Sequence, residues 1–267
     1  MRTALTIAGS DPSGGAGLQA DLKTFHQHGV YGMSVVTLLT VQNTRGVTRV
    51  ETLAPELVIQ QLESVLSDIA PGAAKSGALG TAAIVEALAS AAKTFTFPFV
   101  VDPVMISKHG HPLLDARAQH MLVSELLPVT TLLTPNTHEA AALSGRTVET
   151  LDDAREAAKA LMQLGPKNVL VKGGHLDGDP VDVLIIGDGT LIEFRTGRIQ
   201  TRHTHGTGCT LSAAITAHLA AGLSMRDAVD RAKRWLTQAI ASAPGFGHGA
   251  GPLNHFAPAD FNGRSSQ

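Results

Sequence analysis

The chain has 267 residues, of which 43% are hydrophobic, and this length suits one large domain with a single buried core. Its 21 basic and 23 acidic residues are scattered and leave a formal net charge of −2. Nothing in the sequence resembles a basic stripe, so we expect neither nucleic acid nor a membrane as a partner. The sequence has no apolar run of about 18 residues and no charged-then-apolar leader, so we expect a cytoplasmic protein. The single cysteine, Cys209, excludes an intrachain disulfide and a multi-cysteine metal site.

Apolar runs rich in β-branched residues alternate with helical patterns along the whole chain. The predicted strands are 3–8, 33–41, 98–102, 129–134, 168–172, 181–186 and 191–196, and the turn signal GDGT joins the last two as a hairpin. The predicted helices are 15–27, 55–69, 81–93, 115–127, 137–143, 151–164, 208–221 and 225–242. This alternation predicts an α/β fold with a mostly parallel, doubly wound sheet. We predict one domain over 1–267, with a frayed tail at 262–267.

The first predicted strand-to-helix turn reads GSDPSGGAGLQAD, residues 9–21, and contains a possible dinucleotide fingerprint at 15–20. That fingerprint also requires an acid about 20 residues later, and no acid lies between Asp21 and Glu51. A P-loop is excluded as well, because no Gly-Lys-Ser/Thr follows the glycines. The turn is therefore a loop of close backbone approach, and a tight turn without any ligand remains the alternative.

Ligands of such sheets bind beyond the carboxyl ends of the strands, so the segments that follow the strands should meet at one edge. These segments are 9–17, 42–43, 75–79, 102–105, 134–139 and 172–175, together with the loop HTHGTGCT at 203–210.

The loop at 203–210 places two glycines at the start of an alanine-rich helix. Glycines there allow backbone N–H groups to converge on one point, and the helix dipole favours an anion at that point. In this position the thiol of Cys209 is expected to have a lowered pKa and some thiolate character. The alternative is a glycine-rich turn in which the cysteine is a small buried hydrophobe.

Charged side chains follow three of the predicted strands. Asp102 in FVVDPV and Glu139 in LLTPNTHEA are carboxylates suited to Mg²⁺ at a phosphoryl-transfer site. The alternatives are a capping acid before Pro103 and a solvated glutamate in a first helical turn. Lys172 in VLVKGGH could meet nucleotide phosphates or could face solvent. Together with the anion site, these residues favour transfer of a phosphoryl group over transfer of a hydride.

At these residues the sequence resembles the hydroxymethylpyrimidine/phosphomethylpyrimidine kinases of thiamine biosynthesis, within the ribokinase-like superfamily. The matching stretches are ALTIAGSDPSGGAGLQADLKTF, VQNTRGV, VVDPVM, LLTPNTHEA, VLVKGGH, THGTGCTLSAAI and GHGAGPLNHF, which span nearly the whole chain in the family's order. The resemblance implies a ribokinase-like fold and usually a homodimer. It implies a kinase that uses ATP and Mg²⁺ to phosphorylate 4-amino-5-hydroxymethyl-2-methylpyrimidine to its monophosphate and then to the diphosphate.

The resemblance assigns the acceptor side of the site to the opening loop and its neighbours. Gly9 and Asp11 would lie against the pyrimidine, and the amide of Gln42 would hydrogen-bond the edge of the ring. Cys209 would lie beside the substrate hydroxyl as the candidate base. Where the family commonly reads Lys-Ile-Gly-Met-Leu, this chain reads KSGAL, so that Ala78 replaces a methionine that would pack on the pyrimidine.

The resemblance assigns the phosphate side to residues from three other segments. Asp102 and Glu139 would position Mg²⁺, and Lys172 would contact ATP. The backbone at the helix start would form the catalytic anion hole, partly in contact with ATP: Gly206, Thr207 and Gly208. The GTGC form also resembles a group of pyridoxal kinases, so a pyridoxal/pyridoxine kinase of vitamin B6 salvage is the alternative function. The intact loop argues against a non-catalytic binding module.

Overall fold

Nine strands form one sheet in the computed structural model, which describes residues 1–105 and 113–259. The strands are β1 (Arg2–Ser10), β2 (Val30–Asn43), β3 (Gly46–Thr52), β4 (Ala73–Ser76), β5 (Phe99–Val101), β6 (Leu132–Leu133), β7 (Val169–Val171), β8 (Val181–Ile185) and β9 (Leu191–Arg195). The α-helices are α1 (Gly17–Gln27), α2 (Pro55–Leu66), α3 (Ala82–Ala92), α4 (Ala116–Met121), α5 (Thr137–Ser144), α6 (Leu151–Met162), α7 (Thr207–Ala220) and α8 (Met225–Ala241).

The sheet runs in the order β3-β2-β1-β4-β5-β6-β7-β8-β9. The neighbours from β2 to β7 pair in parallel, whereas β3 and the β8–β9 hairpin are antiparallel additions at the two edges. The predicted mostly parallel sheet and its terminal hairpin are therefore confirmed. Parallel strands place all their carboxyl ends at one edge, which is where ligands of such sheets bind.

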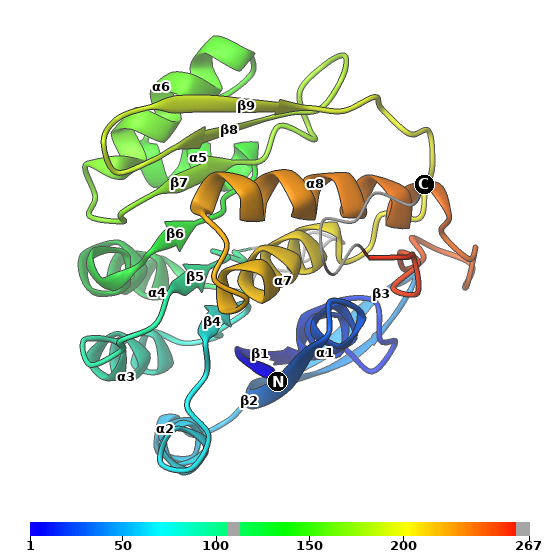
Figure 1. Ribbon diagram of the computed structural model, residues 1–267. Helices are drawn as coiled ribbons and strands as arrows, with labels where there is room; N and C mark the ends of the chain where they lie inside the picture. Colours follow the sequence, from blue (N-terminus) through cyan, green and yellow to red (C-terminus); the bar gives the residue numbers. More distant parts are fainter. Residues whose placement is uncertain (106–112, 260–267) are drawn as a thin grey trace.

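Helices cover both faces of the sheet (Figure 1). On one face α1, α7 and α8 bury side chains such as Phe25, Leu211 and Trp235 against the strands. On the other face α2 to α6 contribute a second core that includes Leu62 and Leu88. Burial of one such leucine stabilises the fold by about 1.5–3 kcal/mol. Helix α7 is buried over nearly its whole length, because its alanines let it pack closely on the sheet.

Three elements differ from the predictions. Strand β3 was not predicted because it is a largely exposed edge strand with no clear apolar alternation. Strand β4 was not predicted because it has only four residues, one of them a lysine. The helix predicted at 115–127 is α-helical only through α4 and continues as a π turn at Leu122–Leu126 and a 3₁₀ turn at Leu127–Val129. Pro128 lacks an N–H group, so a regular α-helix cannot continue through it.

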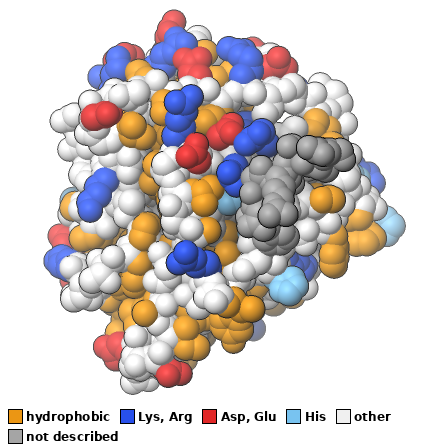
Figure 2. All heavy atoms as spheres, viewed as in Figure 1, with side chains coloured by type: hydrophobic (Ala, Val, Ile, Leu, Met, Phe, Trp, Pro, Cys, Tyr) orange, Lys and Arg blue, Asp and Glu red, His pale blue; other side chains and the backbone are white. Residues whose placement is uncertain are grey.

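The surface of the protein carries charges of both signs. On the face shown in Figure 2, acidic and basic side chains are interspersed. Within residues 1–105 and 113–259, no helix combines the length and hydropathy needed to cross a membrane. The predicted frayed tail at 262–267 lies outside the described residues.

Candidate active site

The segments predicted to meet at the carboxyl edge of the sheet do so around one cavity of about 800 Å³. Every residue singled out from the sequence lines this cavity: Gly9, Asp11, Gln42, Ala78, Asp102, Glu139, Lys172, Gly206, Thr207, Gly208 and Cys209. The prediction of one shared edge is therefore confirmed, while the individual roles of these residues remain predictions.

Asp11 joins the opening loop to the loop before α7. Its carboxylate accepts hydrogen bonds from the backbone and hydroxyl of Ser13 (2.9 and 2.7 Å) and from the backbone of Ala16 (2.9 Å). Its Oδ2 also lies 2.8 Å from Nε2 of His205. Burial acts to raise the pKa of Asp11, but the bonds with His205 and Ser13 outweigh it and lower that pKa. The carboxylate of Asp11 therefore holds the opening loop against His205. Its direct contact with substrate stays a prediction.

Gly17 of the opening stretch and Gly206 at the start of α7 have structural roles that need no dinucleotide. Gly17 has φ +55°, and a Cβ there would lie 2.3 Å from the carbonyl oxygen of Gly9. Gly206 has φ +78°, and a Cβ there would lie 1.8 Å from the carbonyl oxygen of Gly15. Only glycine permits both the left-handed backbone and these contacts. The glycines therefore allow the opening loop to fold on itself and to pack against the start of α7.

The N-terminus of α7 faces the cavity. Gly206 is the N-cap of this helix, and no side chain of that residue can cap it. The N–H groups of the first helical turn have no partner within the helix, and the positive end of the helix dipole adds to them. Since residues 206–209 line the cavity, this turn is suited to bind an anion. Thr207 donates its hydroxyl to the carbonyl of Thr204 at 2.8 Å.

The predicted lowering of the Cys209 pKa is wrong for the protein described here. Burial raises the pKa of the thiol to about 11, and the charges of Asp21 and Asp102 act in the same direction. Lys75 and a hydrogen bond with the backbone of Gly17 oppose this rise without cancelling it. The thiol therefore keeps its proton at neutral pH, because its desolvation outweighs the local positive charge.

Asp102 and Lys172 form an ion pair between the ends of β5 and β7. Nζ of Lys172 lies 2.8 Å from Oδ1 of Asp102, which Thr134 also approaches at 3.3 Å. A Cβ at Gly208 would lie 3.1 Å from that Nζ, so the pair borders the anion-binding turn. Lys172 is thus not a solvent-facing lysine, and Asp102 is buried in the site rather than a simple turn cap.

Glu139 is buried, so the alternative of a solvated glutamate is wrong. It lies in the first turn of α5, where its carboxylate accepts a bond from the backbone of Asn136 at 2.8 Å and completes a capping box. Burial raises the pKa of Glu139 to about 7, with Asp102 adding to the rise and Lys172 opposing it. A cation placed near two buried carboxylates would relieve this cost of burial.

The two carboxylates fit a Mg²⁺ ion that arrives with a nucleotide. Among the described residues, no group of three or more His, Cys, Asp or Glu side chains could hold a metal by itself. Protein-bound Mg²⁺ usually takes one or two carboxylates and completes its coordination with water and substrate phosphates. Asp102 and Glu139 have the donor atoms for the protein's share of such a set, and their role as Mg²⁺ ligands stays a prediction.

Gln42 lies at the cavity end of β2. Its Nε2 is 3.0 Å from Nε2 of His205, so Gln42 and Asp11 meet at the same imidazole nitrogen. His205 belongs to the loop HTHGTGCT, but no role was predicted for it from the sequence. Its place next to the glycines of that loop could have marked it as a site residue.

Sequence reasoning also missed the part of the cavity wall that α8 provides. There Lys233 lies 2.6 Å from Asp182, which accepts a 2.9 Å bond from the backbone of Gly173. Apolar side chains from α7 and α8 also line the cavity: Leu211, Leu236 and Ile240. An apolar wall with a few placed polar groups suits a flat ring such as a nucleotide base. The sequence offered no local signal, because these residues have the ordinary pattern of packed helices.

A family model for phosphomethylpyrimidine kinase matches residues 11–254. This chain belongs to that family. A hydroxymethylpyrimidine/phosphomethylpyrimidine kinase of Rhizobium meliloti is 48% identical over 257 residues, which cover 95% of this chain and 96% of the relative. The predicted family is therefore confirmed.

Solved structures of two kinases match the fold of this family member. A phosphomethylpyrimidine kinase from Clostridium difficile is 43% identical with a TM-score of 0.81, covering 90% of this chain and 100% of that one. A pyridoxal kinase from Staphylococcus aureus in complex with ADP is 37% identical with a TM-score of 0.89, covering 96% and 94%. The predicted ribokinase-like architecture is confirmed, and the chain is a kinase by family.

Proposed function

We propose that this protein is an ATP-dependent phosphotransferase that phosphorylates 4-amino-5-hydroxymethyl-2-methylpyrimidine and then its monophosphate, as a step of thiamine biosynthesis. The observation that carries the proposal is the single cavity that unites an acceptor wall, an anion-binding helix start and a lysine–carboxylate cluster. Phosphoryl transfer depends mainly on positioning and charge stabilisation, and this cavity offers both.

On the phosphate side, the N–H groups at the start of α7 bind the phosphoryl oxygens and stabilise the charge that develops on them. Lys172 adds a positive charge next to that turn. Asp102 and Glu139 hold Mg²⁺, which when bound neutralises charge on the nucleotide phosphates. The apolar wall formed by α7 and α8 contacts the nucleotide base.

On the acceptor side, Gln42 hydrogen-bonds the edge of the pyrimidine, and Gly9 packs against one face of the ring. The contact between Asp11 and His205 holds the opening loop against the loop before α7. Cys209 in its thiolate form takes the proton of the hydroxymethyl group as the alcohol oxygen bonds to the terminal phosphorus and ADP leaves. Because the thiol pKa is about 11, the thiolate is a minor species at neutral pH. The rate should therefore rise with pH across the neutral range.

An ADP-release assay with a panel of alcohols tests this function directly. We expect turnover with the hydroxymethylpyrimidine and with its monophosphate, and none with a sugar such as ribose. Turnover with ribose alone, or with the monophosphate alone, would contradict the bifunctional pyrimidine kinase.

A pyridoxal kinase activity is the second candidate, and Ala78 is the observation that favours it. Ala78 lines the acceptor wall where the family commonly has a larger methionine, so a bulkier ring can be admitted. A hydrophobic pocket rejects extra size only weakly, about 10–200-fold per methylene. The same assay with pyridoxal measures this activity, which we expect to be weaker than that with the pyrimidine because Gln42 is retained.

We further propose a cytoplasmic homodimer formed through the β2–β3 hairpin. Alternate residues of β2 line the cavity, whereas Leu39 and Val41 point away from it and are 48% and 57% exposed. Two adjacent exposed apolar side chains on an edge hairpin favour association with a second copy. Sedimentation should show a dimer that Val41→Glu dissociates, while Leu57→Glu on exposed α2 leaves it intact.

A further inference from the structure

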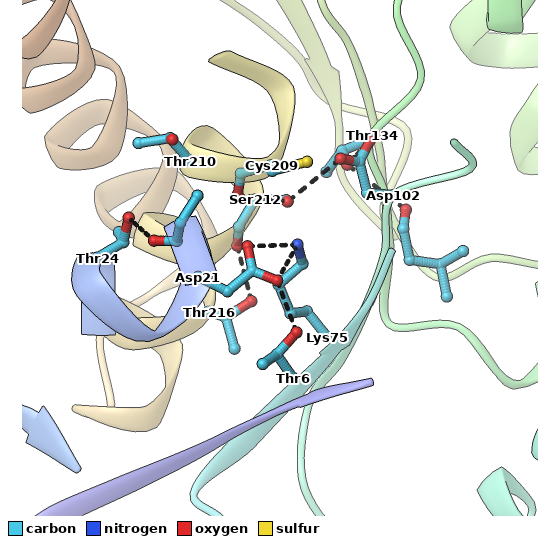
Figure 3. A network of polar contacts seen from close by, with 12 residues as sticks. Thr6, Asp21, Thr24, Lys75, Asp102, Thr134, Cys209, Thr210, Ser212 and Thr216 are labelled. Atoms are coloured by element: carbon cyan, nitrogen blue, oxygen red, sulfur yellow. Dashed lines mark hydrogen bonds and ion pairs between the residues drawn. The ribbon is translucent and has the colours of Figure 1, made fainter. Parts of the chain in front are cut away.

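A fully buried ion pair lies beside the cavity, and the proposed function gives it no role. Asp21 of α1 and Lys75 of β4 are both 0% exposed. Nζ of Lys75 donates to both oxygens of Asp21 at 2.8 and 2.9 Å, and the hydroxyl of Thr6 donates to Oδ2 at 2.6 Å (Figure 3). The pair thus ties β1, α1 and β4 together directly below the cavity.

Stability alone is a poor reason for such a pair. Burial of two charges costs so much desolvation that replacement by a well-packed neutral pair is often neutral or stabilising. Burial acts to lower the pKa of Lys75, but the charges of Asp21, Cys209 and Asp102 outweigh it and raise that pKa. Lys75 therefore keeps its proton beside Asp21, although burial also raises the pKa of Asp21 itself.

The position of this charge points to the reaction. Lys75 borders the same cavity as Cys209, and a Cβ at Gly77 would lie 3.8 Å from its Nζ. Figure 3 shows Nζ of Lys75 bonded to Asp21, and it draws Cys209, at the start of α7, in the same view. Among the groups that act on the thiol, Lys75 is the largest influence that favours the negative form.

We propose that Lys75, oriented by Asp21, is a fixed positive charge that stabilises negative charge at Cys209 during phosphoryl transfer. Lys75 is a positioning residue that acts through the Cys209 loop, and this role rests on the proposed kinase function. In a region with little water, a preorganised charge is worth far more than in solution. Asp21 supplies orientation, because its two bonds to Nζ fix the position of the ammonium.

The test compares a neutral pair with the native one. Lys75→Met with Asp21→Asn removes both charges while it keeps the approximate volume, so the doubly substituted enzyme should retain a melting temperature near that of the wild type. Cys209 is the only cysteine, so the rate of alkylation by iodoacetamide reports this thiol alone. We expect alkylation at fixed pH to slow severalfold, because Lys75 acts on the thiol more strongly than Asp21, so that loss of the ammonium outweighs loss of the opposing carboxylate. We expect kcat to fall by a similar factor or more, with both KM values nearly unchanged.

Controls separate the role of charge from general destabilisation. Leu88→Ala in α3 creates a cavity in the core away from the site, so it should lower the melting temperature without changing the alkylation rate. If the Met/Asn pair does not fold, Lys75→Gln with Asp21→Asn offers a hydrogen-bonded neutral pair for the same measurements. A folded neutral-pair enzyme with wild-type alkylation and kcat would show that the ion pair is only structural. Failure of the proposed function shows separately, as absent pyrimidine turnover in the wild type, because alkylation needs no substrate.

Discussion

Glu139→Gln isolates the charge of one proposed Mg²⁺ ligand from its structural role. Glutamine has nearly the same volume, and its amide oxygen can still accept the bond from the backbone of Asn136, so the capping box survives. What disappears is a buried carboxylate whose pKa is raised by burial from 4.5 to about 7. The variant therefore tests whether that charge binds the metal.

The raised pKa makes a prediction for the metal-free protein. A folded pKa above the unfolded value means that the stabilising contribution is complete below about pH 4.5 and is lost as pH rises through about 7. The difference corresponds to about 3 kcal/mol, at 1.36 kcal/mol per pH unit. Urea unfolding of the wild type should show this loss between pH 4.5 and 7, and Glu139→Gln should remove that share of it.

The same pKa sets the Mg²⁺ requirement. With a pKa of about 7, Glu139 is roughly one-tenth ionised at pH 6 and nine-tenths ionised at pH 8, so protons compete with Mg²⁺ at low pH. We expect the half-saturating Mg²⁺ concentration of the wild type to be about tenfold higher at pH 6 than at pH 8. In Glu139→Gln it should be higher at every pH and lose most of this dependence. Initial rates against free Mg²⁺ at fixed ATP measure both effects.

A matched control and a refuting result complete this experiment. Glu156→Gln changes an exposed glutamate on α6 and should leave the Mg²⁺ titration unchanged. Any pH dependence that arises from protonation of ATP itself should therefore be the same in this control and in the wild type. If Glu139→Gln shows the Mg²⁺ titration of the wild type at pH 6 and pH 8, then Glu139 caps α5 and does not hold the metal.

The other predictions concern the acceptor side. Cys209→Ala should lower kcat by about 10²–10⁴ with nucleotide binding nearly intact, and wild-type kcat should rise with pH towards the thiol pKa of about 11; full activity of the alanine variant would assign catalysis to the anion hole alone. Gln42→Leu should raise KM for the pyrimidine by an amount equivalent to roughly 1–3 kcal/mol and barely change KM for ATP, whereas equal changes in both would indicate a folding defect. Ala78→Met should lower KM for the pyrimidine and suppress any pyridoxal turnover together; if neither changes and the wild type has no pyridoxal turnover, another side chain fills the space.

The sequence by itself determined the sheet class, most of the elements and a group of residues that line the cavity. Strand periodicity and helix signals are properties of neighbours a few positions apart, so they survive without knowledge of the fold. A parallel α/β sheet then requires that residues following its strands converge, which is why Gln42, Asp102, Glu139 and Lys172 were found together. The edge strand β3 and the four-residue β4 carry too little periodic pattern for this reasoning.

Tertiary structure decided the electrostatics of the site. The partners of its buried charges are distant in sequence: Lys75 and Asp21 are 54 positions apart, and Lys172 and Asp102 are 70 apart. The helix start at 206–209 predicted a lowered pKa for Cys209, yet burial beneath the opening loop raises it to about 11. Desolvation depends on everything packed around a group, and the residues that pack around Cys209 come together only when α1, β4 and α7 are in place.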